Sequence, residues 1–359
     1  MNKLKTFFLL IFFVVAATGI IAQRGKQVPL SISGYYAGST TAVDSFPINK
    51  LNYLIFSFCH LKGNRLSVDR AADTATIQKM VSLKQAIPGL KIILSLGGWG
   101  GCKDCSPVFS TRKGRKEFAE STKELMEYFN TDGIDLDWEY PVIAGYPGHP
   151  YSLDDKENFT SLIKMLRRKL GEKFEISFAA GGFSSFIDSA IEWKKVMHRA
   201  DKVNLMSYDL VHGFSKISGH HTPLFSAQQQ LESVDNGVTK LLNAGVPSNK
   251  IVIGAAFYAR VFANDIHANN GLYQPTKFEY GVSYKNFDTT FTKEKGYQYF
   301  WDPVAQAPYM YNEIQRSFAS FDDTISILQS IQVRLRNGLI ILHIHLRSFL
   351  GSRGHVIAG

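Results

Sequence analysis

Short apolar runs alternate with amphipathic segments along most of the chain. The runs are nearly continuous and rich in β-branched and aromatic residues, which predicts strands that are buried on both faces. They lie at residues 30–36, 51–61, 91–96, 132–141, 174–180, 203–208 and 251–256. Apolar residues at helical spacing between them predict helices. These helices lie at 73–86, 111–129, 157–170 and 227–244.

This alternation predicts the fold class. Strands separated by helices form a parallel sheet, and seven strands before residue 260 favour a closed (β/α)8 barrel over a doubly wound sheet. The alternation breaks at residues 262–318, which are rich in Tyr, Phe, Gly and Thr. Residues 338–346 are apolar enough to form an eighth, atypical strand. We therefore expect a barrel at 23–261, an insertion at 262–318 and an atypical barrel end at 319–359.

The N-terminus predicts export. Two lysines, Lys3 and Lys5, precede an apolar run that ends at the small residue Ala22. This order is typical of a secretory signal peptide at residues 1–22, with an uncleaved anchor as the alternative. We expect cleavage after Ala22, a secreted or periplasmic product, and no membrane association after cleavage.

Charge and cysteine content exclude some functions. The formal net charge is +9, but the basic residues form neither a long run nor a nucleic-acid motif, so we expect no nucleic-acid partner. Cys102 and Cys105 are able to close a small disulfide loop or to bind a metal weakly, and Cys59 is expected to be a buried thiol. His343 and His345 alternate onto one face without a third ligand nearby. We expect no metal and no cofactor.

The clearest chemical signal is the strand D-G-I-D-L-D-W-E-Y-P at residues 132–141. Its side chains alternate between two faces, and the apolar face carries Ile134, Leu136 and Trp138. The other face carries Asp135, Asp137 and Glu139. Repulsion among these acids should raise at least one pKa and provide a proton donor near neutral pH. Pro141 should end the strand after Glu139, at the barrel end that carries chemistry. An acidic edge strand and a cation site are the alternatives.

This stretch closely resembles the D-G-x-D-x-D-W-E-Y-P signature of glycoside hydrolase family 18, the chitinases and their relatives. Three other strand ends also resemble family motifs: S-L-G-G at 95–98, M-S-Y-D at 206–209, and G-x-x-x-Y-x-R at 254–260. Residues 262–318 resemble the small α+β insertion that some members carry between strands seven and eight. The resemblance covers about residues 28–328 and implies cleavage of β-1,4-N-acetylglucosaminide bonds in chitin or chito-oligosaccharides.

The resemblance also implies a substrate-assisted, retaining mechanism without a cofactor. Glu139 is expected to protonate the leaving oxygen and then to act as a base toward water. Asp137 is expected to orient the substrate's acetamido group, and Asp135 to share a proton with Asp137. Tyr208 is expected to donate a hydrogen bond to the same group. The expected sugar-binding residues are Tyr35, Phe58, Ser95, Gly98, Trp99, Met206, Asp209, Tyr258 and Arg260. We expect a monomer that binds chitin or N-acetylglucosamine oligosaccharides.

The resemblance ends near Leu328. The family carries a tryptophan after its last strand as an aromatic floor under the sugar, but this chain has no tryptophan after Trp301. Our hypothesis is that the reading frame shifts near Leu328. A catalytically impaired chitin-binding or glycan-binding protein is therefore an alternative. A relative that cuts the core of N-glycans is another, although such relatives often lack the insertion.

Overall fold

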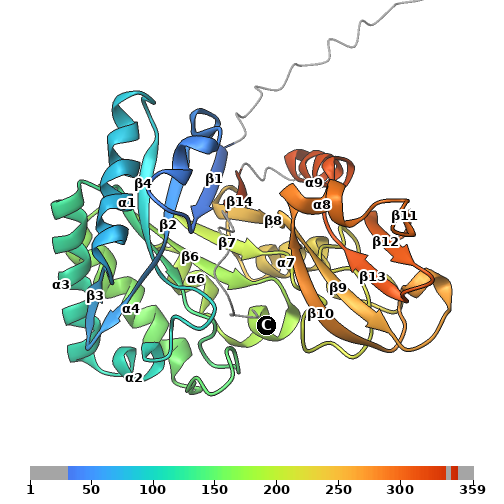
Figure 1. The fold of residues 1–359 in the computed structure, drawn as a ribbon. Helices are drawn as coiled ribbons and strands as arrows, with labels where there is room; N and C mark the ends of the chain where they lie inside the picture. The colour runs from blue at the N-terminus through green and yellow to red at the C-terminus, as the bar shows by residue number, and fades with distance from the viewer. Residues whose placement is uncertain (1–30, 337–340, 347–359) are drawn as a thin grey trace, which may run out of the picture.

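Eight parallel strands form the central sheet of the computed structural model, which describes residues 31–336 and 341–346 (Figure 1). The strands are β1 (Ser31–Tyr36), β2 (Tyr53–Lys62), β4 (Lys91–Gly97), β5 (Gly133–Asp137), β6 (Glu175–Gly181), β7 (Lys202–Met206), β8 (Ile251–Ala255) and β14 (Ile341–Leu346). β14 pairs with β8 and with β1, and β1 pairs with β2. The sheet therefore closes into the expected barrel, with β14 as the eighth strand. The predicted signal peptide and residues 347–359 lie outside the described residues.

Helices cover the outside of this barrel (Figure 1). The helices longer than two turns are α1 (Ala71–Ser82), α3 (Arg112–Phe129), α4 (Asp155–Leu170), α7 (Val234–Asn243) and α9 (Thr324–Arg336). The shorter helices are α2 (Cys105–Phe109), α5 (Ser184–Ser189), α6 (Trp193–Met197) and α8 (Phe287–Thr290). The helix predicted at 227–244 begins later, at Val234, because the Ser233 side chain caps it by accepting from the Asn236 amide. The residues before the cap form a turn, in which Ala227 and Gln230 pair. Among the described residues, no helix is long and apolar enough to cross a membrane.

The apolar face of the acid strand packs as predicted. Ile134, Leu136 and Trp138 are buried between the barrel and its helices. The Trp138 ring lies 5.5 Å from the Phe109 ring of α2 and 6.2 Å from the Phe159 ring of α4, measured between centroids. Burial of one such side chain stabilises a fold by about 1.5–3 kcal/mol. This packing fixes the register of β5 and sends its acidic side chains to the barrel interior.

The N-terminal end of the barrel is closed by charged groups. The Lys202 ammonium forms an ion pair with Glu175 and lies 3.6 Å from the centroid of the Tyr53 ring. Lys91 approaches the second carboxylate oxygen of Glu175 at 3.4 Å. The side chains of Lys202 and Glu175 are only 13% and 9% exposed, so this pair is largely removed from water. Burial lowers the pKa of Lys202, and the Glu175 carboxylate opposes that effect. The first residues of β2, β4, β6 and β7 thus contact one another at this end of the barrel.

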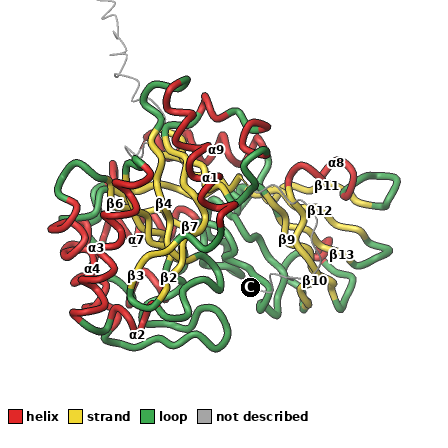
Figure 2. Tube along the Cα trace, turned by 60° about the vertical axis from the view of Figure 1, so that its left-hand side comes forward, coloured by secondary structure: helices red, strands yellow, loops and turns green. Residues whose placement is uncertain are grey.

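The insertion forms a second, antiparallel sheet beside the barrel (Figures 1 and 2). Its strands are β9 (Tyr258–Asn264), β10 (Thr276–Ser283), β11 (Tyr297–Asp302), β12 (Ala307–Asn312) and β13 (Ser317–Ser320), in the order β10-β9-β13-β12-β11. The sheet has apolar clusters of its own, one of which includes Phe262, Tyr309 and Phe318. Only two residues separate β8 from β9, so β9 carries its side chains directly from the barrel rim into the insertion. The antiparallel pair β2–β3 (Arg65–Ser67) is a smaller addition to the barrel.

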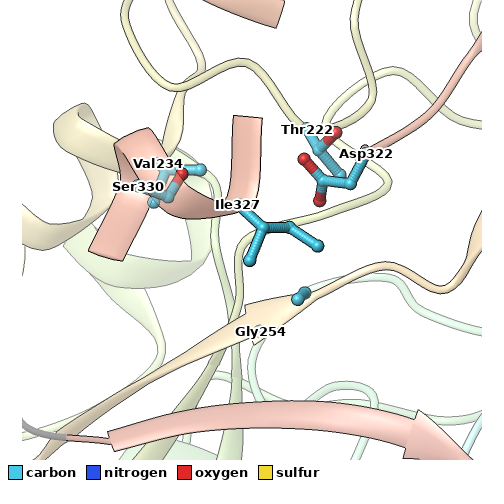
Figure 3. A pocket seen from close by; sticks show the side chains of 7 residues that line it. Thr222, Val234, Gly254, Asp322, Ile327 and Ser330 are labelled. Atoms are coloured by element: carbon cyan, nitrogen blue, oxygen red, sulfur yellow. The ribbon is translucent and has the colours of Figure 1, made fainter. Parts of the chain in front are cut away.

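A small cavity lies where α9 packs on the barrel (Figure 3). It is lined by Thr222, Val234, Gly254, Ala255, Asp322, Ile327 and Ser330. The space in it that the centre of a water molecule is able to reach is about 10 Å³, which is about the minimum needed to hold one water. The Ser326 hydroxyl donates to Asp322 at 2.8 Å beside it. This cavity is too small for a sugar.

Candidate active site

The acidic residues of β5 lead from the barrel interior toward its C-terminal rim. Asp135 is fully buried, Asp137 is nearly so, and Glu139 is partly exposed. The strand ends at Asp137, two residues before the predicted end at Glu139. The Asp137 carbonyl instead accepts from the Gly98 amide of the loop that follows β4. Glu139 therefore lies just beyond the strand, at the rim.

Asp135 is enclosed by four hydrogen-bond donors. One carboxylate oxygen accepts from the Tyr35 hydroxyl at 2.9 Å and from the Ser95 hydroxyl at 2.7 Å. The other accepts from the Ser177 hydroxyl at 2.7 Å and from the Asn204 amide at 2.9 Å. Burial raises the pKa of Asp135, and the donors partly offset this because they favour the charged form. A raised pKa was expected from repulsion between the acids, but burial is its cause at Asp135.

Two tyrosines lie beside Asp137 and Glu139. Burial raises the pKa of both Tyr140 and Tyr208, and the negative charges of the two acids raise it further. Both phenols therefore keep their protons at neutral pH and remain hydrogen-bond donors. Tyr140 is fixed by ring contacts with Phe183 at 5.5 Å and Phe186 at 5.4 Å. Tyr208 packs with Met206, Ala179, Ala256 and Tyr258 at the ends of β6, β7 and β8.

Asp209, which follows β7, forms a polar cluster with two residues of β9. It accepts from the Tyr258 hydroxyl at 2.7 Å and from two nitrogens of Arg260, both at 2.7 Å. Burial acts to raise the pKa of Asp209, but the Arg260 guanidinium outweighs it and holds that pKa well below its usual range. The Asp209 side chain is still 28% exposed, whereas that of Arg260 is 9% exposed. The cluster thus links the barrel to the insertion and keeps one face accessible.

The loop after β4 brings aromatic rings and glycines to the same rim. Gly98 has a φ of +77°, and a β-carbon there would lie 2.4 Å from the Phe58 ring. Only glycine fits this close approach. Trp99 is partly exposed and lies 5.6 Å from the Tyr146 ring. Cys102 of this loop forms a disulfide bond with Cys105, the first residue of α2, and Cys59 is a buried free thiol.

The structure separates the predicted sugar-binding residues into two layers. Tyr35 and Ser95 are buried in the barrel interior, where the hydroxyl groups of both donate to Asp135. The others lie near the rim. They are Phe58, Gly98, Trp99, Met206, Asp209, Tyr258 and Arg260. Among the described residues, no group of three or more His, Cys, Asp or Glu side chains is arranged to hold a metal ion. The side chains of His343 and His345 lie outside the described part of the chain.

Sequence reasoning missed three neighbours of the acids: Tyr140, Ser177 and Asn204. A signal for two of them was present. Apart from the charged residue that begins each strand, Ser177 and Asn204 are the polar residues of β6 and β7, and a buried polar side chain in a barrel strand needs a partner. The signal for Tyr140 was its position next to Glu139 in the acid motif.

A closed (β/α)8 barrel with a partly exposed glutamate after a buried aspartate pair defines a glycosidase of the barrel class. The particular family follows from comparison with known proteins. The family model described as "Glycosyl hydrolases family 18" matches residues 31–343, and the chain belongs to that family. The resemblance noted in the sequence is thereby confirmed.

Three relatives illustrate the likeness. "Chitinase A1" of Niallia circulans is 33% identical over 275 residues, which are 70% of this chain but only 39% of that protein. "Chitotriosidase-1" of Mus musculus is 28% identical, and the match covers 90% of this chain and 73% of that protein. A solved family 18 N-acetylglucosaminidase from Paenibacillus barengoltzii is 32% identical with a TM-score of 0.80. That match covers 88% of this chain and 94% of the solved chain.

Proposed function

We propose that this chain hydrolyses β-1,4-N-acetylglucosaminide bonds in chitin or chito-oligosaccharides by substrate-assisted, retaining catalysis. One observation carries the proposal. Asp135, Asp137 and Glu139 follow one another from a closed polar cage to a partly exposed rim, with the Tyr208 phenol beside the last two. The names of the relatives, chitinases and an N-acetylglucosaminidase, support the substrate class.

Glu139 acts first as the acid. It gives its proton to the glycosidic oxygen while the bond from that oxygen to the anomeric carbon breaks. The acetamido oxygen of the substrate forms the new bond to the anomeric carbon and produces an oxazolinium ion. Water then attacks the same carbon and gives a proton to Glu139, while the bond between that carbon and the acetamido oxygen breaks. Glu139 thereby returns to its starting state and the acetamido group is regenerated. Two inversions at one carbon retain the β configuration.

Asp137 and Tyr208 serve the acetamido group. Asp137 stabilises the positive charge that develops on its nitrogen, and Tyr208 donates a hydrogen bond that holds its oxygen near the anomeric carbon. Asp135 supports Asp137 from the barrel interior, because its four donors stabilise negative charge in a fully buried site. We expect the two acids to share a proton.

Two other carboxylates near the rim are already bound by protein groups, which supports a nucleophile that the substrate itself supplies. Asp209 is bound by Arg260 and Tyr258, and Asp322 accepts from Ser326. Neither is a free carboxylate poised to attack the anomeric carbon. We assign Asp209, Tyr258 and Arg260 to sugar binding on the side of the insertion. We assign Phe58, Gly98 and Trp99 to sugar binding on the side of β2 and β4.

Hydrolysis of chitotetraose tests the proposal. The wild-type chain from Gln23 to Gly359 should release shorter oligosaccharides, and Glu139→Gln should release none while it still binds the substrate. The substitution keeps the shape of the side chain and removes only its proton transfer. Release by Glu139→Gln at a rate near wild type would contradict the assignment of the acid.

A sugar-binding protein without turnover is the second candidate. The absence of any tryptophan after Trp301 favours it, because the floor under the cleaved sugar is then missing. Binding of chitotetraose without hydrolysis by the folded wild-type chain would support this candidate over the first.

We further propose that residues 1–22 are a signal peptide and that the product is secreted or periplasmic. Mass spectrometry of the product exported from a bacterial host should give an N-terminus at Gln23. An N-terminus that retains residues 1–22 would contradict this.

A further inference from the structure

Two consecutive histidines lie in the long segment between β7 and α7, and each faces a different partner. Both are fully buried. The Nε2 atom of His220 lies 3.0 Å from Asp302, at the end of β11 in the insertion. His221 turns the other way, and its Nδ1 atom lies 3.6 Å from Oδ1 of Asp209. His221 is thus the one of the pair that contacts the proposed sugar-binding cluster.

The backbone of His221 is held on both sides. Its amide donates to the Ser320 hydroxyl of β13 at 2.8 Å. Its carbonyl accepts from the amide of Leu210, the residue that follows Asp209, at 3.1 Å. The position of the imidazole relative to Asp209 is therefore fixed by the insertion and by the barrel loop together.

The ring itself is packed but has no hydrogen bond. It lies 5.3 Å from the Tyr258 ring, at 45° to it. Among the described residues, neither ring nitrogen has a partner within hydrogen-bond distance. A buried polar ring without a partner is costly, so its presence calls for an explanation. The nearest acceptor in the cluster is the Asp209 oxygen, which lies just beyond hydrogen-bond distance and comes within it after a small side-chain shift.

Asp209 is held by its neighbours in a left-handed backbone conformation. Its φ is +55°, in a region that aspartate adopts more often than most residues other than glycine. Its carboxylate accepts hydrogen bonds from Arg260 and Tyr258 of the insertion, and its side chain is 28% exposed whereas the His221 side chain beside it is fully buried. A shift of Asp209 would also move Arg260 and Tyr258, because both donate hydrogen bonds to its carboxylate oxygens.

We propose that His221 is a positioning residue, which supports Asp209 from its buried side and so keeps Arg260 and Tyr258 oriented for sugar binding. This inference rests on the proposed function. It assigns His221 to substrate affinity and not to proton transfer at Glu139. Loss of its ring nitrogens should weaken binding of the oligosaccharide and should change turnover of bound substrate little.

Four variants test this assignment. His221→Leu and His221→Phe remove the nitrogen donor while they keep an apolar side chain in the site. His221→Asn restores a donor near the Nδ1 position. Thr222→Val is the matched control, since Thr222 is the next residue, is also buried, and has a hydroxyl without a partner among the described residues. Thermal unfolding of each variant reports its stability.

The first measurement is the Kd of chitotetraose, determined by calorimetry in the Glu139→Gln background, where substrate is not consumed. We expect His221→Leu and His221→Phe to raise the Kd about tenfold, which corresponds to about 1.4 kcal/mol. His221→Asn and Thr222→Val should stay within about twofold of the parent chain. With Glu139 intact, kcat should fall less than about threefold. In an Asp209→Asn background, His221→Leu should have almost no further effect on the Kd.

The outcomes separate this inference from the function on which it rests. A wild-type chain that hydrolyses chitotetraose, with an unchanged Kd in both donor-free variants, would overturn the role of His221 alone. That role is also overturned if His221→Asn weakens binding as much as His221→Leu does, since the effect would then come from packing. A wild-type chain that neither binds nor cleaves chitotetraose would overturn the proposed function and this inference with it.

Discussion

Asn204 gives the sharpest test of the polar cage around Asp135. Its amide donates to Asp135 and to the Tyr35 hydroxyl, both at 2.9 Å, and the residue is almost fully buried. Asn204→Leu keeps the number and the branching of the side-chain heavy atoms and removes both donations. A hydrogen bond to a charged group contributes about 1.5–3 kcal/mol and a neutral one about 0.5–1.5 kcal/mol. We therefore expect the free energy of unfolding to fall by about 3 kcal/mol near neutral pH.

The effect should depend on pH in a defined direction. Burial raises the pKa of Asp135 in the folded chain, and loss of a donor raises it further. A group whose pKa is raised by folding favours the folded state when it is protonated, and this contribution is lost as the pH rises through the folded-state pKa. The stability deficit of Asn204→Leu should therefore be smallest in acid and largest above neutral pH. The acidic limb of the kcat profile should move to higher pH.

Two assays check this prediction. Urea unfolding at several pH values measures the loss of stability in Asn204→Leu. Hydrolysis of chitotetraose across the same pH range gives the acidic limb of the kcat profile. Ser33→Ala is the control, because Ser33 is a buried barrel residue whose hydroxyl has no partner among the described residues. The reasoning is refuted if Asn204→Leu shows a deficit that does not change with pH, together with an unmoved limb.

Three further predictions concern the charged groups at the N-terminal end of the barrel, the loop after β4, and the residues proposed to bind the acetamido group. Glu175→Ala should lower the free energy of unfolding by about 3 kcal/mol, because it leaves Lys202 buried without its partner. The kcat of this variant should stay near wild type. Urea unfolding measures the first quantity and the hydrolysis assay the second. Gly98→Ala should lower the thermal midpoint of unfolding and weaken chitotetraose binding. Residue 98 has a positive φ, and a β-carbon there would collide with the Phe58 ring. An unchanged Kd measured by calorimetry would contradict this prediction. Tyr208→Phe should lower kcat by about 10²-fold with little change in stability, because it removes one preorganised donor; a kcat within about threefold of wild type would refute that role.

The sequence predicted the barrel because its signals are local. Strand residues such as Ile134 and Leu136 are buried wherever the neighbouring strands lie, so their pattern alone indicates the element. The acidic face was readable for the same reason, since alternation within one strand decides which side chains share a face. The eighth strand at 341–346 was also predicted from its apolar, β-branched residues.

The remaining features depend on contacts between distant residues. Ser177 and Asn204 meet Asp135 only because β6 pairs with β5, and β7 with β6, so that their side chains share the barrel interior at sequence separations of 42 and 69 residues. The end of β5 at Asp137 also depends on its neighbour β4, because the Asp137 carbonyl accepts from the Gly98 amide where the pairing of the two strands ends. The proposed role of His221 was not predictable from the sequence, because its backbone is held by Ser320 of the folded insertion. The proposed reading-frame shift near Leu328 stays a prediction that resequencing of the gene will decide.

The anomeric form of the first product tests the central claim most directly. Proton NMR of chitotetraose during the first minutes of hydrolysis separates the α and β anomers before they equilibrate. Our account predicts that the wild-type chain releases the β anomer first and that Glu139→Gln releases no product. Initial release of the α anomer would contradict the substrate-assisted mechanism, and release of either anomer by Glu139→Gln at the wild-type rate would contradict the assignment of Glu139 as the acid.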